Sequence, residues 1–315
     1  MVEWNQTVQK MIDWLEAHLT SESLLGEMSR QVGYSPYYCS TLFHRVAGVT
    51  IKGYVAGRRL ALAALDLRNS QKRVIDIAVE YGFSSQEALT RAFRGAFGCT
   101  PAAYRKNPTP IPLRMSKEVF HPAHYAELYQ GGGTMSMENL KEARVRMEYI
   151  PAHKYMGIWE DRAGDYDEFW QYQDCDQVCG MIESMRNESH PVVTCHTAGW
   201  RWVRGERKYF YGMGVPEDYS GPVPKGFEIK SFPGSYYLVF YHPPFSYMED
   251  NGEVMRRVEE LAWNYDLAGK GLSDPLLNYQ DSRGLFTWNE EACQCYQRHY
   301  PEGIGYEVLR PVKWN

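Results

Sequence analysis

Apolar and polar positions alternate most clearly at helical spacing between residues 84 and 98. Ser84 or Ser85 is suited to cap a helix here by accepting a bond from a free backbone N–H, and Gly98 and Pro101 are suited to end it. Gly82, just before, supplies the positive φ of a tight turn. The apolar face holds Ala88, Leu89, Ala92, Phe93, Ala96 and Phe97, and the polar face holds Gln86, Glu87, Thr90, Arg91 and Arg94.

The same unit occurs about 50 residues earlier. Its glycine turn is Gly33, and its polar positions are the 50-residue-shifted partners of those above. A small residue, a glycine four positions later and a capped amphipathic helix form the helix-turn-helix pattern. Two tandem copies predict a duplicated DNA-binding unit, whereas the alternative is an ordinary helical bundle with two helical corners. The polar face of the first copy holds Pro36, Tyr37, Ser40, Thr41 and His44.

We call the capped amphipathic helix of each repeat its reader helix, and the first reader helix is predicted over 36–47. The remaining periodicity in this half predicts helices over 8–19, 24–31, 51–68 and 74–81. The helix over 51–68 would span about 27 Å at 1.5 Å per residue. That length approaches the roughly 34 Å between successive major grooves on one side of DNA, which indicates a spacer between two readers. Arg58 and Arg59 on this helix are either phosphate contacts or part of a solvated face.

Beyond residue 107 the pattern changes. Residues 108–143 are rich in proline and glycine and read as a linker. Strands are predicted over 145–150, 155–159, 192–198, 209–214, 226–232, 235–242, 292–299 and 305–312, and helices over 167–185 and 253–265. The order predicts a multidomain chain: an all-α tandem helix-turn-helix domain (1–107), then an α+β domain (144–315) with an apparent β-α-β-β duplication.

Charge supports this division. Residues 1–107 carry 13 Lys and Arg against 9 Asp and Glu, a net charge of +4, and the remainder carries 21 against 30, a net charge of −9. A basic segment joined to an acidic one favours DNA binding by the first segment alone. The whole-chain charge of −5 conceals this difference.

Residues 7–106 resemble the DNA-binding domain of AraC/XylS regulators. The resemblance is carried by Ile12-Asp13-Trp14-Leu15-Glu16, Val32-Gly33-Tyr34-Ser35, Ile77-Ala78-Val79-Glu80-Tyr81-Gly82-Phe83 and Leu89-Thr90-Arg91-Ala92-Phe93-Arg94. It implies that Tyr37, Ser40 and Thr41 face bases in one major groove, and Gln86, Glu87, Thr90 and Arg91 in the next, with Arg94 beside them. Arginine pairs well with guanine and glutamine with adenine.

The second half resembles the GyrI-like effector-binding domain, in the Rob-like order of domains. The matching segments include Pro151-Ala152-His153-Lys154-Tyr155-Met156-Gly157, Phe232-Pro233-Gly234-Ser235-Tyr236-Tyr237 and Tyr296-Gln297-Arg298-His299-Tyr300-Pro301. The resemblance implies a cleft of the multidrug-binding kind with a central carboxylate that answers a cation. Gln297 stands at that position, a departure that removes the charge and keeps only hydrogen-bonding dipoles.

Seven of the nine tryptophans lie in this half, which suits an aromatic-walled pocket for a flat apolar effector, although any single ring is more often core. The effector candidates are Trp159, Trp170, Tyr211, Tyr241, Gln297 and Glu307, with Glu290 and Glu291 as alternative carboxylates. Because Gln297 is neutral, we expect uncharged aromatic ligands to bind at least as well as cations of equal size.

Other classes of function are less favoured. Seven cysteines in no metal spacing indicate free thiols in a reducing compartment, and neither a cofactor, a metal nor a catalytic set is predicted. The chain shows no apolar run long enough for a membrane span. We therefore expect a cytoplasmic bacterial regulator whose partners are double-stranded DNA, a small effector and RNA polymerase. A C-terminal hydrolase or a protein-binding module remains the alternative.

Overall fold

The computed structural model describes residues 2–21, 23–116, 144–242, 247–270, 285–300 and 305–315. It divides into two compact units, and a short segment of the later sequence, Asp174–Met185, belongs to the first one. A helical first half is thus followed by an antiparallel sheet domain, which confirms the predicted fold class. Along the described part of the chain, no helix combines the length and the apolar character that crossing a bilayer requires.

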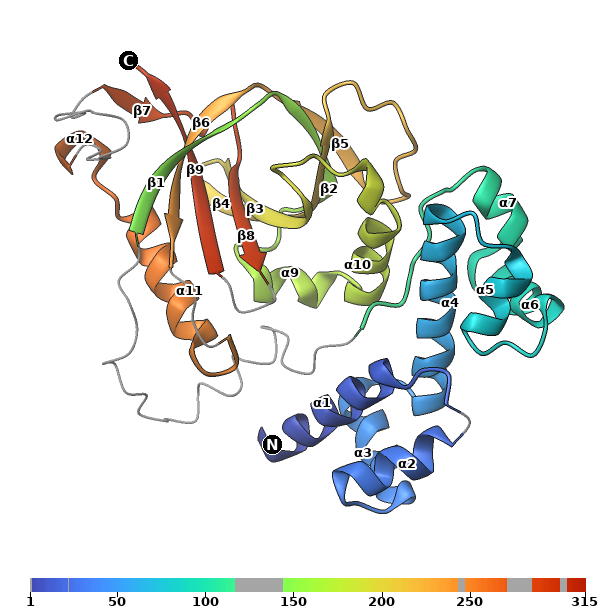
Figure 1. Cartoon of the computed structure of the whole chain (residues 1–315). Coiled ribbons are helices and arrows are strands. Elements are labelled where there is room, and N and C mark those ends of the chain that lie inside the picture. The colour runs from blue at the N-terminus through green and yellow to red at the C-terminus, as the bar shows by residue number, and fades with distance from the viewer. Residues whose placement is uncertain (1, 22, 117–143, 243–246, 271–284, 301–304) are drawn as a thin grey trace. The chain divides into compact units, whose positions relative to one another are not determined.

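The first unit is built from short helices around one long helix (Figure 1). Its reader helices begin and end within a residue of the predicted bounds, because their caps are local in sequence. The helices are α1 (Val2–Ala17), α2 (Leu24–Val32), α3 (Pro36–Ala47), α4 (Ile51–Asn69), α5 (Val74–Glu80), α6 (Gln86–Phe97), α7 (Pro101–Lys106) and α10 (Cys175–Ser184).

The caps of the two repeats correspond closely. Ser35 and Ser85 each accept a hydrogen bond at 3.2 Å from the backbone N–H three residues later. Gly48 and Gly98 end the reader helices in the left-handed conformation, with φ of 70° and 76°. A side chain is rarely tolerated there, so glycine is required at both ends. The duplication read from the sequence is therefore present in three dimensions.

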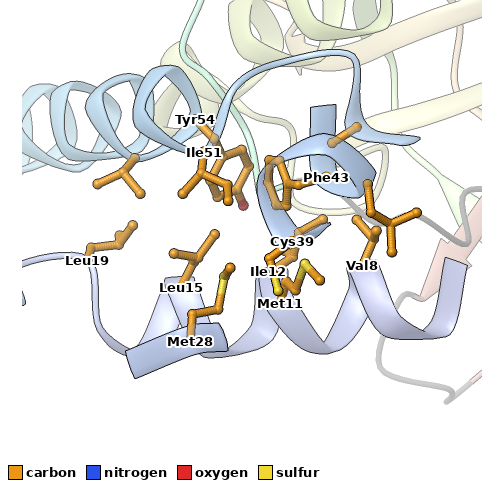
Figure 2. Close-up of a cluster of buried hydrophobic side chains, with 13 residues drawn as sticks. Val8, Met11, Ile12, Leu15, Leu19, Met28, Cys39, Phe43, Ile51 and Tyr54 are labelled. Atoms are coloured by element: carbon orange, nitrogen blue, oxygen red, sulfur yellow. The ribbon is translucent and has the colours of Figure 1, made fainter. Parts of the chain in front are cut away.

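Each repeat has its own apolar core, and α4 contributes to both. Figure 2 shows the first core, where Phe43 packs against Tyr54 of α4 and the apolar side chains of α1 and α2 complete the cluster. Phe93 is the equivalent in the second core and packs with Leu60 and Leu67 from the other end of α4. Burying apolar surface on both halves of one helix fixes the spacing of the two repeats.

Residues 108–116, which the sequence assigned to the linker, form a segment that we call the strap. Ile111 and Leu113 of the strap are buried in the second core. Ser116 and the Arg114 carbonyl are hydrogen-bonded to α4, through Tyr54 and Arg58 respectively. The rest of the predicted linker, 117–143, lies outside the described residues.

Within its described residues, the second unit contains a nine-stranded antiparallel sheet in the order β1-β6-β9-β8-β3-β4-β2-β5, with β7 paired to β9. A short strand, β7, was not predicted. The strands are β1 (Arg144–Ile150), β2 (His153–Glu160), β3 (Cys195–Val203), β4 (Glu206–Pro216), β5 (Glu228–Phe232), β6 (Ser235–Tyr241), β7 (Phe286–Trp288), β8 (Cys295–Tyr300) and β9 (Gly305–Trp314). The helical elements are α9 (Tyr166–Tyr172), η2 (Arg186–Glu188), α11 (Tyr247–Trp263) and α12 (Leu267–Lys270).

One helix predicted over 167–185 is two helices, and the prediction was wrong on this point. Gln173 adopts an extended backbone after α9, and Asp174 caps α10 by accepting a bond from the Gln177 N–H at 3.1 Å. A capping aspartate starts a new helix because it satisfies an otherwise free N–H. This break separates α9, in the sheet unit, from α10, in the helical unit.

Strand register sorts the side chains of the sheet onto two faces. Partnered residues in an antiparallel pair point to the same side, so Tyr211, Ala198 and Gln297 share one face. Helix α9 lies against β4, and α11 lies along β9 and β6. The opposite face carries a separate apolar core that includes Tyr155, Phe210, Tyr237, Tyr296 and Leu309.

Candidate nucleic-acid interface and effector site

The polar faces of α3 and α6 are open to solvent, as a DNA-reading surface requires. Tyr37 is 83% exposed, Thr41 is exposed and Ser40 is partly exposed. On α6 the exposed positions are Gln86, Glu87, Arg91 and Arg94, and Thr90 is half-buried. All eight predicted DNA-contact residues therefore lie on the two reader helices, on the sides away from the cores.

Two of these side chains already have a local role. The Thr41 hydroxyl donates to the Tyr37 carbonyl at 3.0 Å, one turn earlier in α3. The methyl group of Thr41 is then the part of this side chain that is left for contact with a base. Hydrogen bonds from Ser85 and from the backbone lower the pKa of Glu87, and the nearby Arg91 lowers it further. Glu87 is thus held ionised at the start of α6, where the helix dipole also favours a carboxylate.

Arg58 contradicts both alternatives considered for it. Its side chain is buried, with Nη2 at 2.8 Å from the Glu16 carboxylate and Nη1 donating to the Arg114 carbonyl at 2.7 Å. A guanidinium enclosed in this way is unavailable to phosphate, and it joins α1, α4 and the strap. No local pattern around Arg58 reveals this role, because its partners lie 42 and 56 residues away along the chain.

Arg59 also has structural partners. Its Nε donates to the Leu19 carbonyl at 2.6 Å, and its Nη1 donates to the Gly82 carbonyl at 3.3 Å. Burial lowers the pKa of this guanidinium, although an arginine stays charged at neutral pH. Arg59 therefore connects the end of the α1 segment to the turn of the second repeat.

The six predicted effector residues fall into two groups. Trp170, Tyr211 and Gln297 belong to the side of the sheet that α9 covers: the rings of Trp170 and Tyr211 lie 4.9 Å apart, and Tyr211 shares the face of Gln297. Trp159, Tyr241 and Glu307 lie on the opposite face by strand register. The structure therefore brings together three of the six.

Glu307 is also engaged electrostatically. Its carboxylate lies 2.6 Å from Arg146 and 2.8 Å from Arg298. Glu290, an alternative carboxylate, lies 2.7 Å from Arg310, and Glu291 is exposed. The arginines beside Glu307 and Glu290 neutralise the negative charge that would attract a cationic ligand.

A different carboxylate lies near Gln297, and sequence reasoning missed it. Glu259 of α11 accepts a hydrogen bond from the Tyr306 hydroxyl at 2.6 Å. The Tyr209 hydroxyl donates to the Gln297 side chain at 2.5 Å, and Tyr209 lies within electrostatic range of Glu259. Helical periodicity within 253–265 was the available signal, but it does not reveal which strand a helix covers.

Burial raises the pKa of Glu259. The Tyr306 hydrogen bond and Arg207 oppose this rise, and Asp165 and Asp167 add to it. Around this carboxyl the aromatic rings form a continuous set, with neighbouring centroids 4.9–6.2 Å apart: Tyr166, Phe169, Trp170, Tyr209 and Tyr211, with Trp200 and Trp263 adjoining. We call these residues, with Gln297, Glu259 and Tyr306, the aromatic cluster.

Comparison with known proteins identifies the first half. A helix-turn-helix domain family matches residues 28–107. The TetD protein of transposon Tn10 from Escherichia coli is 38% identical over 100 residues, which cover 32% of this chain and 72% of that protein. SoxS of Salmonella typhimurium is 35% identical over 100 residues, which cover 32% of this chain and 94% of SoxS.

A longer alignment covers nearly half of the chain. The Right origin-binding protein of Escherichia coli K12 is 31% identical over 163 residues, 48% of this chain, and the match spans only 56% of that protein. Among solved structures, the DNA-binding domain of AdpA in complex with a target DNA is 25% identical, with 31% of this chain and 89% of that chain covered and a TM-score of 0.30.

The reader helices, their caps and the solvent-exposed polar faces are the features that DNA recognition by two helix-turn-helix units requires. SoxS, a relative named as a regulatory protein, is covered over 94% of its length by an alignment of about this size. The chain therefore belongs to the AraC/XylS family of DNA-binding transcription regulators, with the Rob-like arrangement of a helix-turn-helix domain ahead of a sheet domain.

Proposed function

We propose that the second unit is a GyrI-like domain that binds a flat aromatic effector, and that the effector changes DNA binding by the first unit. The observation that carries this proposal is the aromatic cluster. Binding sites for drug-sized molecules combine aromatic walls with a few polar groups that fix orientation. Gln297 and Glu259 provide such groups among the rings of α9 and β4.

The charge of the site bears on the class of effector. Because Gln297 replaces the carboxylate that the resemblance implies, the sequence favoured neutral ligands. Glu259, on α11, supplies a carboxylate near this position. Two further carboxylates, Asp165 and Asp167, lie close enough to raise the pKa of Glu259, and Arg207 lowers it. An excess of negative charge among aromatic faces favours a cation, through both the carboxylate and the rings. We therefore propose an aromatic effector that carries a positive charge.

On DNA, the two repeats are proposed to read successive major grooves from one monomer. Arg91 is the candidate for a bidentate contact to guanine, and Gln86 for one to adenine. Tyr37 and the Thr41 methyl suit contact with thymine methyl groups. RNA polymerase is a further proposed partner, which follows from the regulatory role of the family alone.

Helix α10 provides the proposed route between effector and DNA. By sequence it directly follows α9, which contributes Phe169 and Trp170 to the aromatic cluster, and only Gln173 and Asp174 separate the two helices. By its contacts, however, α10 belongs to the DNA-binding unit. Its Ser184 hydroxyl accepts a bond from the strap at Ile111 N–H, 3.0 Å away.

Three more contacts hold α10 to the helical unit. Gly180 meets the backbone of Leu113, where an added Cβ would lie 1.9 Å from the carbonyl oxygen. Arg68 of α4 donates to the last carbonyls of α10, at Glu183 and Ser184. Arg114 of the strap lies 3.1 Å from Asp176. A ligand that displaces α9 would therefore pull on a helix anchored beside the spacer α4.

Titration of matched neutral and cationic aromatic ligands, followed by tryptophan fluorescence, tests the proposal. We expect the cation to bind about tenfold more tightly or better, a difference of about 1.4 kcal/mol. Glu259→Gln is expected to abolish this preference, and Gln297→Glu to increase it. Glu291→Gln is the matched control, because this carboxylate is exposed and lies outside the aromatic cluster.

Two results would count against the proposed site. A cation preference that survives in Glu259→Gln would mean that another group supplies the charge. If neither ligand changed the fluorescence of the natural chain, and no aromatic compound altered its melting temperature, the effector role would be refuted. DNA binding measured on the same samples reports the regulatory step separately.

A further inference from the structure

We propose that Cys175 and Cys179 form a dithiol site on α10 that takes a soft, thiophilic centre of the class of trivalent arsenic. The two residues stand one helical turn apart, and their sulfur atoms lie 3.6 Å from each other. This proposal is independent of the aromatic effector, because it concerns a different set of side chains and a different chemistry.

The separation suits a bridging atom. Two thiolates bonded to one atom at about 2.3 Å each place their sulfurs roughly 3.3–3.8 Å apart for bond angles of about 90–110°, a range that includes the pyramidal geometry of trivalent arsenic. A direct disulfide fits less well, since Cβ atoms one turn apart on a helix lie about 5–6 Å from each other and a disulfide needs about 3.5–4.5 Å. The intact α10 thus favours a two-thiolate complex over oxidation.

The number of protein side chains available at this site also limits which kind of metal or metalloid centre it can bind. Among the described residues, no group of three or more His, Cys, Asp or Glu side chains is arranged to hold a metal ion. Structural zinc uses four protein ligands, so a centre satisfied by two thiolates fits better. A trivalent organoarsenical brings its own third substituent and needs only two sulfurs from the protein.

Access distinguishes this pair from most of the other cysteines. None of the seven is in a disulfide. Cys175 and Cys179 are partly exposed, whereas four others are buried within their units, namely Cys39, Cys195, Cys293 and Cys295. Cys99, beside the C-terminal end of α6, is also partly exposed and is a natural single-thiol comparison.

The binding step balances without an oxidant. With phenylarsine oxide as the probe, two S–H bonds break, two As–S bonds form, and the oxygen of the reagent leaves as water. Arsenic remains trivalent throughout. The product closes a ring across one turn of α10, which cross-links and stabilises that helix, while Gly180 and Ser184 continue to hold it to the strap.

Intact-mass measurement of the full chain with phenylarsine oxide, in the presence of excess monothiol, tests the site. We expect one phenylarsenic per chain, removed by a competing dithiol and retained in Cys99→Ser. Cys175→Ser and Cys179→Ser should each weaken binding about a hundredfold or more, because the second thiolate acts at high effective concentration. The melting temperature should rise with the probe in the natural chain and in Cys99→Ser, but not in Cys175→Ser or Cys179→Ser.

Three results would overturn the proposal. One is an adduct that persists in both Cys175→Ser and Cys179→Ser, and another is an adduct that monothiol displaces as readily as dithiol. The third is an adduct that forms only after denaturation, which would show that the folded pair is inaccessible. Circular dichroism of the serine variants confirms that α10 and its unit remain folded, so that a lost adduct reports the lost thiol.

Discussion

At the scale of single residues, Arg91 offers the sharpest test of base reading. Its guanidinium lies on the exposed face of α6 beside Glu87. If Arg91 contacts guanine, Arg91→Ala should cost about 1–3 kcal/mol and relax the preference at one base position. Binding to a library of operator variants measures both. Equal weakening on every sequence would make Arg91 a phosphate contact instead.

Glu160 gives a prediction about acid. Hydrogen bonds from Arg162 and Gln173 lower the pKa of its carboxyl to about 2 from a usual 4.5, against the opposing effect of burial. The folded state therefore binds its proton less readily than the unfolded state, so this contribution to stability is complete above pH 4.5 and is lost toward pH 2. Glu160→Gln should lower the free energy of unfolding near pH 6 and have little effect near pH 2.

Urea unfolding at several pH values measures this difference. Glu217→Gln, at an exposed position directly after β4, is the matched control and should change stability equally little at both pH values. The hydrogen bond from Gln173 to Glu160 also fixes the link between α9 and α10, because Gln173 lies between these two helices. A constant difference between natural and Glu160→Gln chains across the acid range would contradict the assignment.

Residue-level prediction from sequence succeeded where the determinants are local. Ser35, Ser85 and the glycines that end the reader helices are set by neighbours within four residues, and the structure has them as predicted. Arg58 and Glu259 could not be placed, because their partners lie far away in the sequence. Periodicity identifies a buried face without naming what covers it.

At the scale of elements, Gly180 should be the most sensitive position of α10. Gly180→Val would force its side chain into the Leu113 backbone, which cannot rotate away as a flexible side chain can. We expect a loss of about 1–3 kcal/mol in the stability of the helical unit, as for other overpacked sites, together with protease cleavage near α10. Hydrogen exchange at 111–116 measures the release of the strap.

The matched control is Gly26→Ala in α2, where an added Cβ meets no atom within 4 Å. Alanine there should be neutral or stabilising by about 0.5–1 kcal/mol, because it restricts the unfolded chain. Unchanged stability and exchange in Gly180→Val would mean that α10 is not held by this contact in solution.

Elements were predicted best where helix or strand signals are strong and least well at their borders. The reader helices and most strands lie where expected, whereas β3 and α11 are displaced or extended relative to the predicted ranges. The assignment of α10 to the helical unit could not be predicted, because it depends on contacts with the strap, such as the bond between Ser184 and Ile111, which are 73 residues apart.

At the scale of the whole molecule, the boundary of the DNA-binding domain can be tested. Sequence composition placed it at residue 107, and Ile111 and Leu113 are buried beyond that point. Fully burying such a side chain is worth about 1.5–3 kcal/mol. A fragment of residues 1–116 should therefore be more stable to urea than a fragment of residues 1–107 by several kcal/mol, with operator contacts unchanged.

A fragment of residues 1–116 carrying serine at both Ile111 and Leu113 separates burial from chain length. It should unfold like the shorter fragment. If all three fragments were equally stable, the strap would make no contribution to the second core, and the boundary at residue 107 would stand.

The position of α10 in the chain has a consequence for synthesis. The strap ends at residue 116 and α10 begins at Cys175, and ribosomes add about 5–20 residues per second. For several seconds, therefore, the nascent chain contains both reader helices, whereas α10, the last helix of the helical unit, has not yet been synthesised. During that interval the regulator is expected to meet DNA in an unrestrained form, which protease protection of stalled nascent chains would reveal.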